Sequence, residues 1–462
     1  MWANDTRRSL GRLGYAESAA RFATLAACGT QGQRSGRGGA ILPRMSLSER
    51  EGQRRVVVTG MGAVTPVGLD VVSTWDALVH GRSGIAPVQA FDVSDLNVRI
   101  AGEVKGFDPS QYMDRKEARR MDRFLHLGIV AAQEAMRDAA LDVRAEDTER
   151  VAVIVGSGIG GIGTIVDAAL TLHTRGPDRV SPFVVPMMLP NMLAGLIAIQ
   201  TGAKGPNFGV SSACATAGHA LGEGAEILRR GDADVVIAGG SEAPITRIGL
   251  AAFDSMRALS RRNDEPQRAS RPFDAERDGF ILAEAAGILV LETLEHASER
   301  KAHIYAELTG YGATSDAYHI TAPSEGGEGA ARAMKLALRR AGLEPAAIDY
   351  INAHGTSTQL NDRTESQAIR SVFGEQAPPV SSTKSMTGHL IGASGAVEAI
   401  VCIKTILEGC LPPTINYEHR DPDCDLDYVP NMARPARVNA TLSNSLGFGG
   451  HNTTLVLQRF GD

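Results

Sequence analysis

The chain of 462 residues has a net charge of −6, with 43% hydrophobic and 22% charged residues, a composition typical of a globular protein of two or three domain-sized units. The net acidity gives no support for a nucleic-acid partner. The five cysteines are odd in number and lack C-x-x-C spacing, so we expect neither a disulfide framework nor a zinc site, and a reducing compartment such as the cytoplasm.

The N-terminal segment differs from the rest of the chain. In residues 1–44 every basic residue is Arg, the only acids are Asp5 and Glu17, and Gly is frequent near residues 31–40. Two interpretations stay open. The segment is an organelle transit peptide, which would send the protein to the mitochondrial matrix or a plastid, or it reflects an upstream start codon, with Met45 as the true first residue. In either case we predict that residues 1–53 form a disordered, non-catalytic extension.

Short apolar runs predict strands at 56–60, 151–156, 235–240 and 348–353. Helical stretches lie between them, for example 116–141, where apolar residues repeat at helix spacing. Strands that alternate with helices predict an α/β protein with mostly parallel sheets. The uncharged stretch 180–203 is long enough to cross a membrane, but Pro186, Pro190, Asn191 and Gly195 interrupt it, so we predict a buried or interface segment and no membrane partner.

An internal repeat divides the ordered chain into two related halves, 54–305 and 306–462. The segment Thr59-Gly-Met-Gly-Ala-Val returns 250 positions later from Thr309, and Val210–His219 returns 170 positions later as Val380–His389. The two segments occur in the same order in each half of the chain. The unequal offsets give the first half about 80 extra residues (250 − 170) before its cysteine, where we expect a cap over a substrate pocket.

Cys214 is a candidate nucleophile. It lies between an expected strand at 208–210 and an expected helix that ends near Gly231. The unpaired N–H groups and the dipole of a helix N-terminus would lower the pKa of its thiol. The alternative is a small buried side chain, as most free cysteines are.

Two further turns are rich in polar residues and carry His354, Lys384 and His389. Ordinary hydrogen-bonded histidines are the alternative, but the repeat equates the Lys384 turn with the Cys214 turn, so both would face one cleft. A thiolate with two neutral imidazoles is suited to thioester chemistry. The glycine-rich segment 444–451 is either a plain turn or a mobile loop whose N–H groups bind an oxyanion, with Phe448 as a gate.

Residues 156–161 match the G-x-G-x-x-G pattern of dinucleotide sites. The stretch that follows runs through Gly176 and Pro177 and does not enter an evident second strand before Asp178. We therefore do not expect a dinucleotide cofactor.

The chain from Arg54 to Phe460 resembles the β-ketoacyl-[acyl-carrier-protein] synthases, condensing enzymes of the thiolase superfamily, and most closely their type II members in fatty acid synthesis. The matching segments are 56–68, 115–122, 258–280, 315–319, 352–358, 380–398 and 444–450. The resemblance implies a five-layered αβαβα thiolase-like fold, a homodimer and acyl carrier protein (ACP) as partner. It implies condensation of an acyl-enzyme thioester with malonyl-ACP to 3-oxoacyl-ACP, CO₂ and free ACP. No cofactor is implied beyond the 4'-phosphopantetheine that ACP carries.

The resemblance also implies roles for individual residues. Cys214 is the acylated nucleophile, His354 and His389 promote malonyl decarboxylation, Lys384 orients this set, and the N–H groups of Cys214 and Phe448 form the oxyanion hole. Thr356 and Thr358 hold pantetheine, and Ile159, Phe253 and Phe448 line the acyl pocket. ACP docks on Lys116, Arg119, Arg120 and Arg257, of which the first three would share one helix face, although a solvated helix face is the usual reason for such a charge run. A structural cation would lie near Asn352, Glu365, Glu398, Ser443 and Asn444.

Competing members of the same superfamily are less consistent with the sequence. A degradative thiolase uses a second, C-terminal cysteine, but none follows Cys424. Chalcone-type enzymes have Asn at the position of His389, and non-catalytic chain-length partners lack the cysteine found here as Cys214. A type II polyketide ketosynthase shares all these motifs and stays open.

Overall fold

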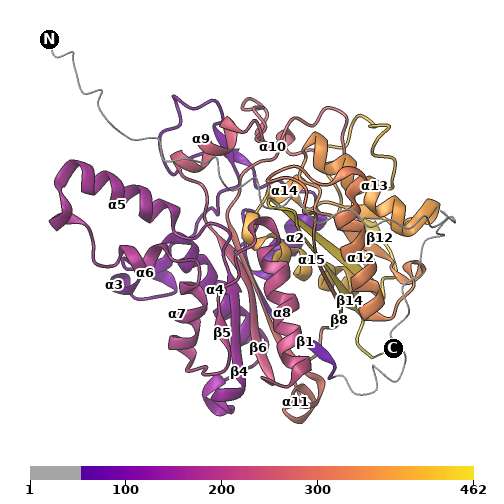
Figure 1. Ribbon diagram of the computed structural model, residues 1–462, viewed down its shortest axis with the longest axis horizontal. Coiled ribbons are helices and arrows are strands. Elements are labelled where there is room, and N and C mark those ends of the chain that lie inside the picture. Colours follow the sequence, from indigo (N-terminus) through magenta and orange to yellow (C-terminus); the bar gives the residue numbers. More distant parts are fainter. Residues whose placement is uncertain (1–53, 462) are drawn as a thin grey trace, which may run out of the picture. The chain divides into compact units, whose positions relative to one another are not determined.

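The computed structural model describes residues 54–461, so the predicted N-terminal extension lies outside the described residues. Ten strands form one sheet in the order β10-β9-β13-β14-β8-β1-β7-β6-β4-β5 (Figure 1). The strands are β1 (Val56–Val64), β4 (Val151–Gly156), β5 (Asn207–Phe208), β6 (Val235–Glu242), β7 (Ala285–Thr293), β8 (Ala306–Ser315), β9 (Tyr350–Asn352), β10 (Val380–Ser381), β13 (Ala440–Gly447) and β14 (His451–Gln458).

The sheet repeats one pattern twice. Outward from the short β1–β8 contact, the order is β1-β7-β6-β4-β5 on one side and β8-β14-β13-β9-β10 on the other. On each side the first three strands are antiparallel and the last three are parallel. The two halves of the chain are therefore related in topology, as the sequence repeat predicts, and the predicted boundary between residues 305 and 306 falls directly before β8.

Helices form three layers around these strands. The middle layer contains α8 (Thr216–Arg230) and α15 (Ser394–Glu408), which pack on each other and on strands of both halves. One outer layer contains α4 (Arg123–Asp138) and α7 (Met192–Thr201), and the other contains α12 (Glu328–Ala341) and α13 (Gln359–Phe373). This arrangement is the five-layered thiolase-like fold expected from the resemblance.

The repeated Thr-Gly-x-Gly segment has a packing reason. Gly60 and Gly62 of β1 lie against backbone carbonyls of α4, and Gly310 and Gly312 of β8 lie against backbone carbonyls of α12. A Cβ atom at any of the four positions would overlap a carbonyl oxygen. The motif therefore lets an outer helix approach the first strand of each half closely.

The helix predicted over residues 116–141 is wrong, because the chain forms two helices there. Asp114 caps the one-turn helix α3 (Arg115–Ala118), and Asp122 accepts a hydrogen bond from the N–H of Phe124 and starts α4. A second N-cap within the run favours a new helix start over continuation. Lys116, Arg119 and Arg120 are all exposed, but they do not share the face of one continuous helix.

The extra residues of the first half include α5 (Ile162–Arg175), α6 (Val184–Met188) and α7, and Figure 1 shows α5 extending away from the sheet. The uncharged stretch 180–203 forms α6 and α7, in which Leu193, Ala194 and Ile197 are buried. Within residues 54–461 we find no helix with the length and apolar character needed to span a bilayer. The remaining elements are α2 (Val71–Val79), β2 (Ala86–Pro87), β3 (Ile100–Ala101), α9 (Arg247–Ser255), α10 (Pro266–Ala269), α11 (Leu294–Glu299), α14 (Lys384–Thr387), β11 (Cys410–Leu411) and β12 (Arg434–Pro435).

Candidate active site

A cleft of about 950 Å³, its open mouth included, is lined by residues from both halves of the chain. The N-terminal ends of the two middle-layer helices meet there, because Cys214 lies just before α8 and Ile391 lies just before α15. Eight of the residues predicted from the sequence line this cleft: Cys214, His354, His389, Thr356, Thr358, Ile159, Phe253 and Phe448.

Cys214 is held in a short 3₁₀ turn, Ala213–Ala215, that leads directly into α8. Ala213 has a left-handed backbone with φ of 50°, which turns the chain sharply at the entrance to the helix. The thiol is buried, and burial raises its pKa to about 12, although the positive charge of Lys384 and the N–H of Phe448 act in the opposite direction. The expectation that the helix terminus gives a low pKa is therefore wrong, because desolvation outweighs the effect of the terminus.

His389 is the immediate neighbour of the thiol. Its Nε2 lies 3.0 Å from Cys214 Sγ, and its Nδ1 lies 3.3 Å from the hydroxyl of Ser394 at the start of α15. The rings of His354 and His389 meet edge to face with centroids 5.2 Å apart. Burial, reinforced by the charge of Lys384, holds the pKa of both imidazoles well below the usual value. Both rings are therefore neutral at physiological pH.

Lys384 lies at the start of α14 and forms a buried ion pair with Glu398 of α15. It does not line the cleft, but its charge acts on Cys214 and on both histidines. The symmetry relation predicted between Cys214 and Lys384 is wrong. The structural counterpart of the Cys214 turn is Ile391–Ala393, which is also a 3₁₀ turn before a middle-layer helix and also begins with a left-handed residue, with φ of 46° at Ile391.

The glycine-rich segment joins β13 to β14 beside the thiol. The N–H of Phe448 interacts with Cys214, as does the cysteine's own N–H. Gly449 donates to the carbonyl of Ile320 at 2.8 Å, and the N–H of Asp316 donates to the carbonyl of Gly450 at 2.9 Å. Both N–H groups predicted for the oxyanion hole thus lie at the sulfur, and the loop that carries one of them is tied to residues 316–320.

The cleft has apolar and polar lining residues. Ile159, Phe253, Phe280 and Ile391 belong to one hydrophobic cluster, and the hydroxyls of Thr356 and Thr358 lie 3.0 Å apart. Sequence reasoning missed Phe280, whose ring meets that of His389 edge to face at 5.2 Å. It also missed Ser394. Both residues lie inside segments that carry the resemblance, but nothing in their local pattern marks a site.

The residues predicted to hold a cation include two unsatisfied acceptors. Asn352 Oδ1 and Glu398 Oε2 are buried and have no hydrogen-bond partner among the described residues. The carboxylate of Glu365 accepts the N–H groups of His354 and Gly355, both at 2.8 Å, and burial raises its pKa to about 7. Asn444 donates to Glu365 at 3.3 Å and Ser443 is buried. The orphaned oxygens fit a positively charged ligand.

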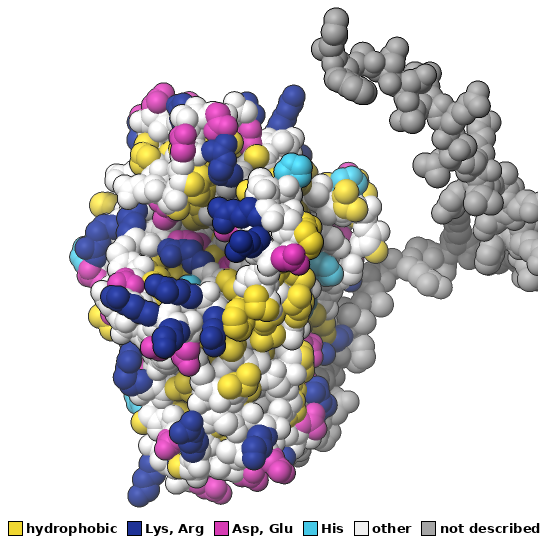
Figure 2. Space-filling model, turned by 90° about the vertical axis from the view of Figure 1, so that its left-hand side faces the viewer, with side chains coloured by type: hydrophobic (Ala, Val, Ile, Leu, Met, Phe, Trp, Pro, Cys, Tyr) yellow, Lys and Arg dark blue, Asp and Glu magenta, His cyan; other side chains and the backbone are white. Residues whose placement is uncertain are grey.

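The residues predicted to dock ACP are all exposed. Lys116, Arg119 and Arg120 belong to the α3 region, and Arg257 follows α9. The guanidinium of Arg120 stacks over the ring of Phe183, 4.7 Å from its centroid. Figure 2 shows many basic side chains gathered on the face that includes this region, next to a hydrophobic patch.

Comparisons with known proteins agree with this geometry. The model of the beta-ketoacyl synthase N-terminal domain matches residues 53–297, and that of the C-terminal domain matches residues 305–418. The chain is 51% identical to 3-oxoacyl-[acyl-carrier-protein] synthase 2 of Synechocystis sp., over 88% of this chain and 99% of the relative. A beta-ketoacyl synthase structure from Burkholderia phymatum matches with a TM-score of 0.82 and 38% identity, over 88% of this chain and all of that one.

A third similarity concerns a complex. The structure of a type II polyketide acyl-carrier protein with its ketosynthase bound to the hexaketide contains a chain that matches with a TM-score of 0.81 and 36% identity, over 88% of this chain and all of that one. The family models cover most of the chain, and the identity to the Synechocystis relative extends over nearly all of that protein. The chain therefore belongs to the beta-ketoacyl synthase family.

Proposed function

We propose that the chain is a β-ketoacyl-ACP synthase of type II fatty acid synthesis, which joins an acyl group on Cys214 to the two-carbon unit of malonyl-ACP. The contact that carries this proposal is the 3.0 Å approach of His389 Nε2 to Cys214 Sγ, with a second neutral imidazole beside it. A thiol, two neutral imidazoles and two backbone N–H groups in one buried cleft are the parts that thioester condensation requires.

The first half-reaction transfers the acyl group. The sulfur of Cys214 attacks the thioester carbonyl of acyl-ACP, and the oxyanion that forms is stabilised by the N–H groups of Cys214 and Phe448. The bond to the pantetheine sulfur then breaks. The proton of Cys214 leaves with that sulfur, so the products are acyl-Cys214 and free ACP. Burial keeps the thiol protonated and therefore opposes this attack. The positive charge of Lys384 acts in the other direction, because it favours the thiolate.

The second half-reaction forms the carbon–carbon bond. Loss of CO₂ from malonyl-ACP leaves an enolate, whose oxygen accepts hydrogen bonds from His354 and His389 as neutral donors. The enolate carbon attacks the acyl-Cys214 carbonyl, and the cysteine sulfur leaves and regains a proton from solvent. Histidines that are already neutral suit this role, because a hydrogen-bond donor without charge needs no proton transfer first.

A cation held by Asn352, Glu365, Glu398, Ser443 and Asn444 is part of the proposal. When bound, it would supply positive charge that satisfies the orphaned oxygens of Asn352 and Glu398 and keeps Glu398 ionised. Glu398 in turn fixes the ammonium group of Lys384. The reaction itself needs no further cofactor, since the substrates bring phosphopantetheine.

We propose a homodimer on the basis of two apolar features, one on α5 and one on β5. Helix α5 has no buried residue, and its Ile165, Leu170 and Leu172 are exposed. Strand β5 is an edge of the sheet and exposes Phe208. An unpaired strand edge and an uncovered apolar helix are favoured sites for a second copy of a chain. Figure 2 faces the side of the molecule from which α5 projects in Figure 1, and it shows exposed hydrophobic side chains there.

ACP is the proposed macromolecular partner and the cytoplasm the proposed compartment. The exposed basic side chains of the α3 region offer an attractive surface to an acidic carrier protein. The cysteines of the described residues, Cys214, Cys402, Cys410 and Cys424, are all free thiols, as a reducing compartment favours. The 51% identity to a 3-oxoacyl-ACP synthase 2, against 36% to a polyketide ketosynthase, favours fatty acid synthesis over the polyketide alternative.

The proposal is tested by incubating the purified protein with acyl-ACP and ¹⁴C-carboxyl-labelled malonyl-ACP. We expect one CO₂ released for each 3-oxoacyl-ACP formed, with saturated acyl chains accepted. Release of CO₂ without a condensation product in the presence of acyl-ACP, or use of polyketide intermediates alone, would refute the assignment.

A further inference from the structure

The turn that carries Thr356 and Thr358 is imposed by contacts from the other half of the chain. Ser357, between the two threonines, is buried and has a left-handed backbone with φ of 70°. A non-glycine residue in this region is strained and persists only where its surroundings fix it. The fixing contacts come from residues 271–279, which we call the clamp segment.

Backbone groups of the clamp segment hold the turn on two sides. The N–H of Arg271 donates to the hydroxyl of Ser357 at 3.0 Å, and the N–H of Gly279 donates to its carbonyl at 3.1 Å. The N–H of Phe273 donates to Asp362, near the start of α13, at 2.8 Å. Phe273 is itself buried and left-handed, with φ of 65°. The two strained residues are thus held by one set of hydrogen bonds.

Within the clamp segment, the side chain of Arg277 contacts the chain directly after the threonine turn. Its guanidinium is buried and donates to the carbonyls of Thr358 at 3.2 Å and Gln359 at 3.1 Å. It also contacts the carboxylates of Asp421 at 2.6 Å and of buried Asp362 at 3.5 Å, and the carbonyl of Asp274 at 2.7 Å. The side chain of Gln359 returns a hydrogen bond to the carbonyl of Arg277 at 2.6 Å. Only the planar guanidinium group of arginine, with its five N–H donors, can reach all these acceptors together, so lysine is a poor replacement.

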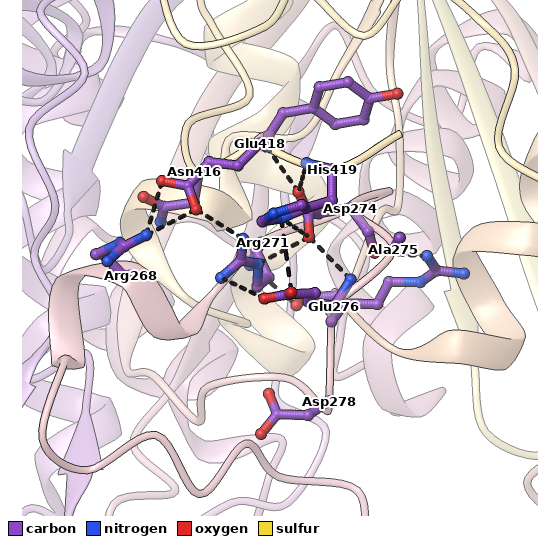
Figure 3. Close-up of polar contacts among 12 residues, drawn as sticks. Arg268, Arg271, Asp274, Ala275, Glu276, Asp278, Asn416, Glu418 and His419 are labelled. Carbon is purple, nitrogen blue, oxygen red and sulfur yellow. Dashed lines mark hydrogen bonds and ion pairs between the residues drawn. The ribbon is translucent and has the colours of Figure 1, made fainter. Parts of the chain in front are cut away.

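The clamp segment is anchored through Asp274, which Figure 3 shows at the centre of its polar contacts. The buried carboxylate accepts hydrogen bonds from Arg271 Nε at 3.0 Å and from the N–H groups of Glu276, Glu418 and His419 at 2.9, 2.6 and 2.7 Å. These contacts tie the clamp segment to residues 418–421. The turn therefore cannot shift unless the clamp segment shifts with it.

The same stretch of backbone continues to the catalytic histidine. Directly after the clamp segment, Phe280 lines the cleft and its ring touches that of His389. The N–H of His389 donates to the carbonyl of Ile281 at 2.7 Å, and the N–H of Ala283 donates to the carbonyl of His389 at 3.0 Å. One continuous segment, 271–283, thus contacts both the threonine turn and His389.

We infer that Arg277 is a positioning residue for the pantetheine arm of the substrate, because it fixes the Thr356 and Thr358 hydroxyls relative to the Cys214–His389 pair. The inference rests on the proposed function, in which these threonines hold the arm. A displaced turn would misplace the arm and its thioester, and an error of about 1 Å costs up to about a hundredfold in rate. The reaction rate of a substrate that lacks the arm would not depend on the position of the turn.

The test is single-turnover acylation of Cys214, followed by intact-mass measurement, with Arg277→Lys. Two donors carry the same acyl group: acyl-pantetheine, and an N-acetylcysteamine thioester that keeps only the thiol end of the arm. We expect the first reaction to slow about tenfold to a hundredfold and the second to change less than about twofold. Arg268→Gln is the matched control, since it removes exposed ion pairs with Glu265 and Glu418 from the same network, and should leave both rates unchanged.

Equal slowing with both donors, or no slowing with either, would overturn the inference. If Arg277→Lys does not fold, Gln359→Ala is used instead, because it removes the hydrogen bonds to the carbonyls of Arg277 and Ala275 without leaving a buried charge. Thr356→Val and Thr358→Val separate this inference from the proposed function. If the threonine variants treat both donors alike, the pantetheine assignment fails. If they discriminate and the clamp variants do not, only the role of Arg277 fails.

Discussion

Lys384 and Glu398 form an ion pair in which both side chains are almost fully buried, at 1% and 2% exposure. The ammonium group acts on three neighbours in ways that serve the same chemistry. It lowers the pKa of the Cys214 thiol, which favours the thiolate, and it lowers the pKa of His354 and His389, which keeps both rings neutral. A single buried charge thus favours the reactive form of every catalytic group.

Removal of this charge has a measurable consequence. Lys384→Met combined with Glu398→Gln removes the pair without leaving an unpaired buried charge. We expect iodoacetamide to alkylate Cys214 about tenfold more slowly at pH 8 than in the wild type, because the loss of a nearby opposite charge raises the thiol pKa by roughly one unit or more. An unchanged alkylation rate, with an unchanged melting temperature, would show that Lys384 does not act on the thiol.

The buried thiol gives a characteristic pH dependence. With a pKa of about 12, Cys214 is protonated throughout the physiological range, and the thiolate fraction rises with pH. The alkylation rate in the absence of substrate should therefore increase about tenfold per pH unit between pH 7 and pH 10, without a plateau. A plateau near pH 7 would mean that the thiol ionises there and that desolvation does not dominate.

The two histidines should matter most for the malonyl half-reaction. His354→Ala and His389→Ala each remove a donor to the enolate oxygen, so malonyl-ACP decarboxylation should fall by about 10²–10⁴. Isothermal titration with malonyl-ACP serves as the control, because binding should change far less than the rate. Normal decarboxylation in both variants would exclude the role proposed for the pair.

Charge reversal tests the docking surface. Lys116→Glu, Arg119→Glu and Arg120→Glu together should weaken acyl-ACP use mainly through the association rate, with a strong dependence on salt. Activity on acyl-pantetheine, which lacks the carrier's charge, should change little. Because Arg120 also stacks on Phe183, the pair Lys116→Glu and Arg119→Glu is the cleaner variant. Equal losses of activity with both substrates would show that these basic residues have a structural role and do not dock ACP.

The proposed dimer is tested by solution mass. Leu170→Asp with Phe208→Asp places charges on the exposed face of α5 and on the β5 edge, and light scattering should show a shift to half the native mass. Val72→Asp is the matched control, because Val72 is at least as exposed but lies on α2, elsewhere in the molecule (Figure 1). A monomeric wild-type protein would contradict the proposal outright.

The sequence predicted those features of the structure whose physical cause lies in a short segment of the chain. The repeated glycines predicted two related halves, because close helix–strand packing demands them in both. The residues Cys214, His354 and His389 converge as expected, since each lies at the end of an element that opens on the cleft. The pKa of Cys214 was mispredicted because desolvation depends on packing by distant residues, which no local pattern records.

Pairings between residues that are far apart in the chain could not be predicted from the sequence either. The counterpart of the Cys214 turn is Ile391–Ala393 and not the Lys384 turn, because α14 lies between β10 and that turn and shifts the alignment by eight residues (178 − 170). The clamp around Ser357 depends on contacts such as that of Arg277, 81 positions from Thr358 in the chain. Spacing along a single sequence does not show such pairings.

Intact-mass spectrometry with peptide mapping shows whether Cys214 carries the acyl group. Wild-type protein incubated with acyl-ACP alone should gain the mass of one acyl group, located on the peptide that contains Cys214. Cys214→Ser should show no such adduct at neutral pH, while Cys410→Ser, which removes a half-buried thiol on β11, should acylate like the wild type. An adduct at wild-type level on Cys214→Ser, or an adduct located on another residue, would mean that Cys214 is not the acylated nucleophile.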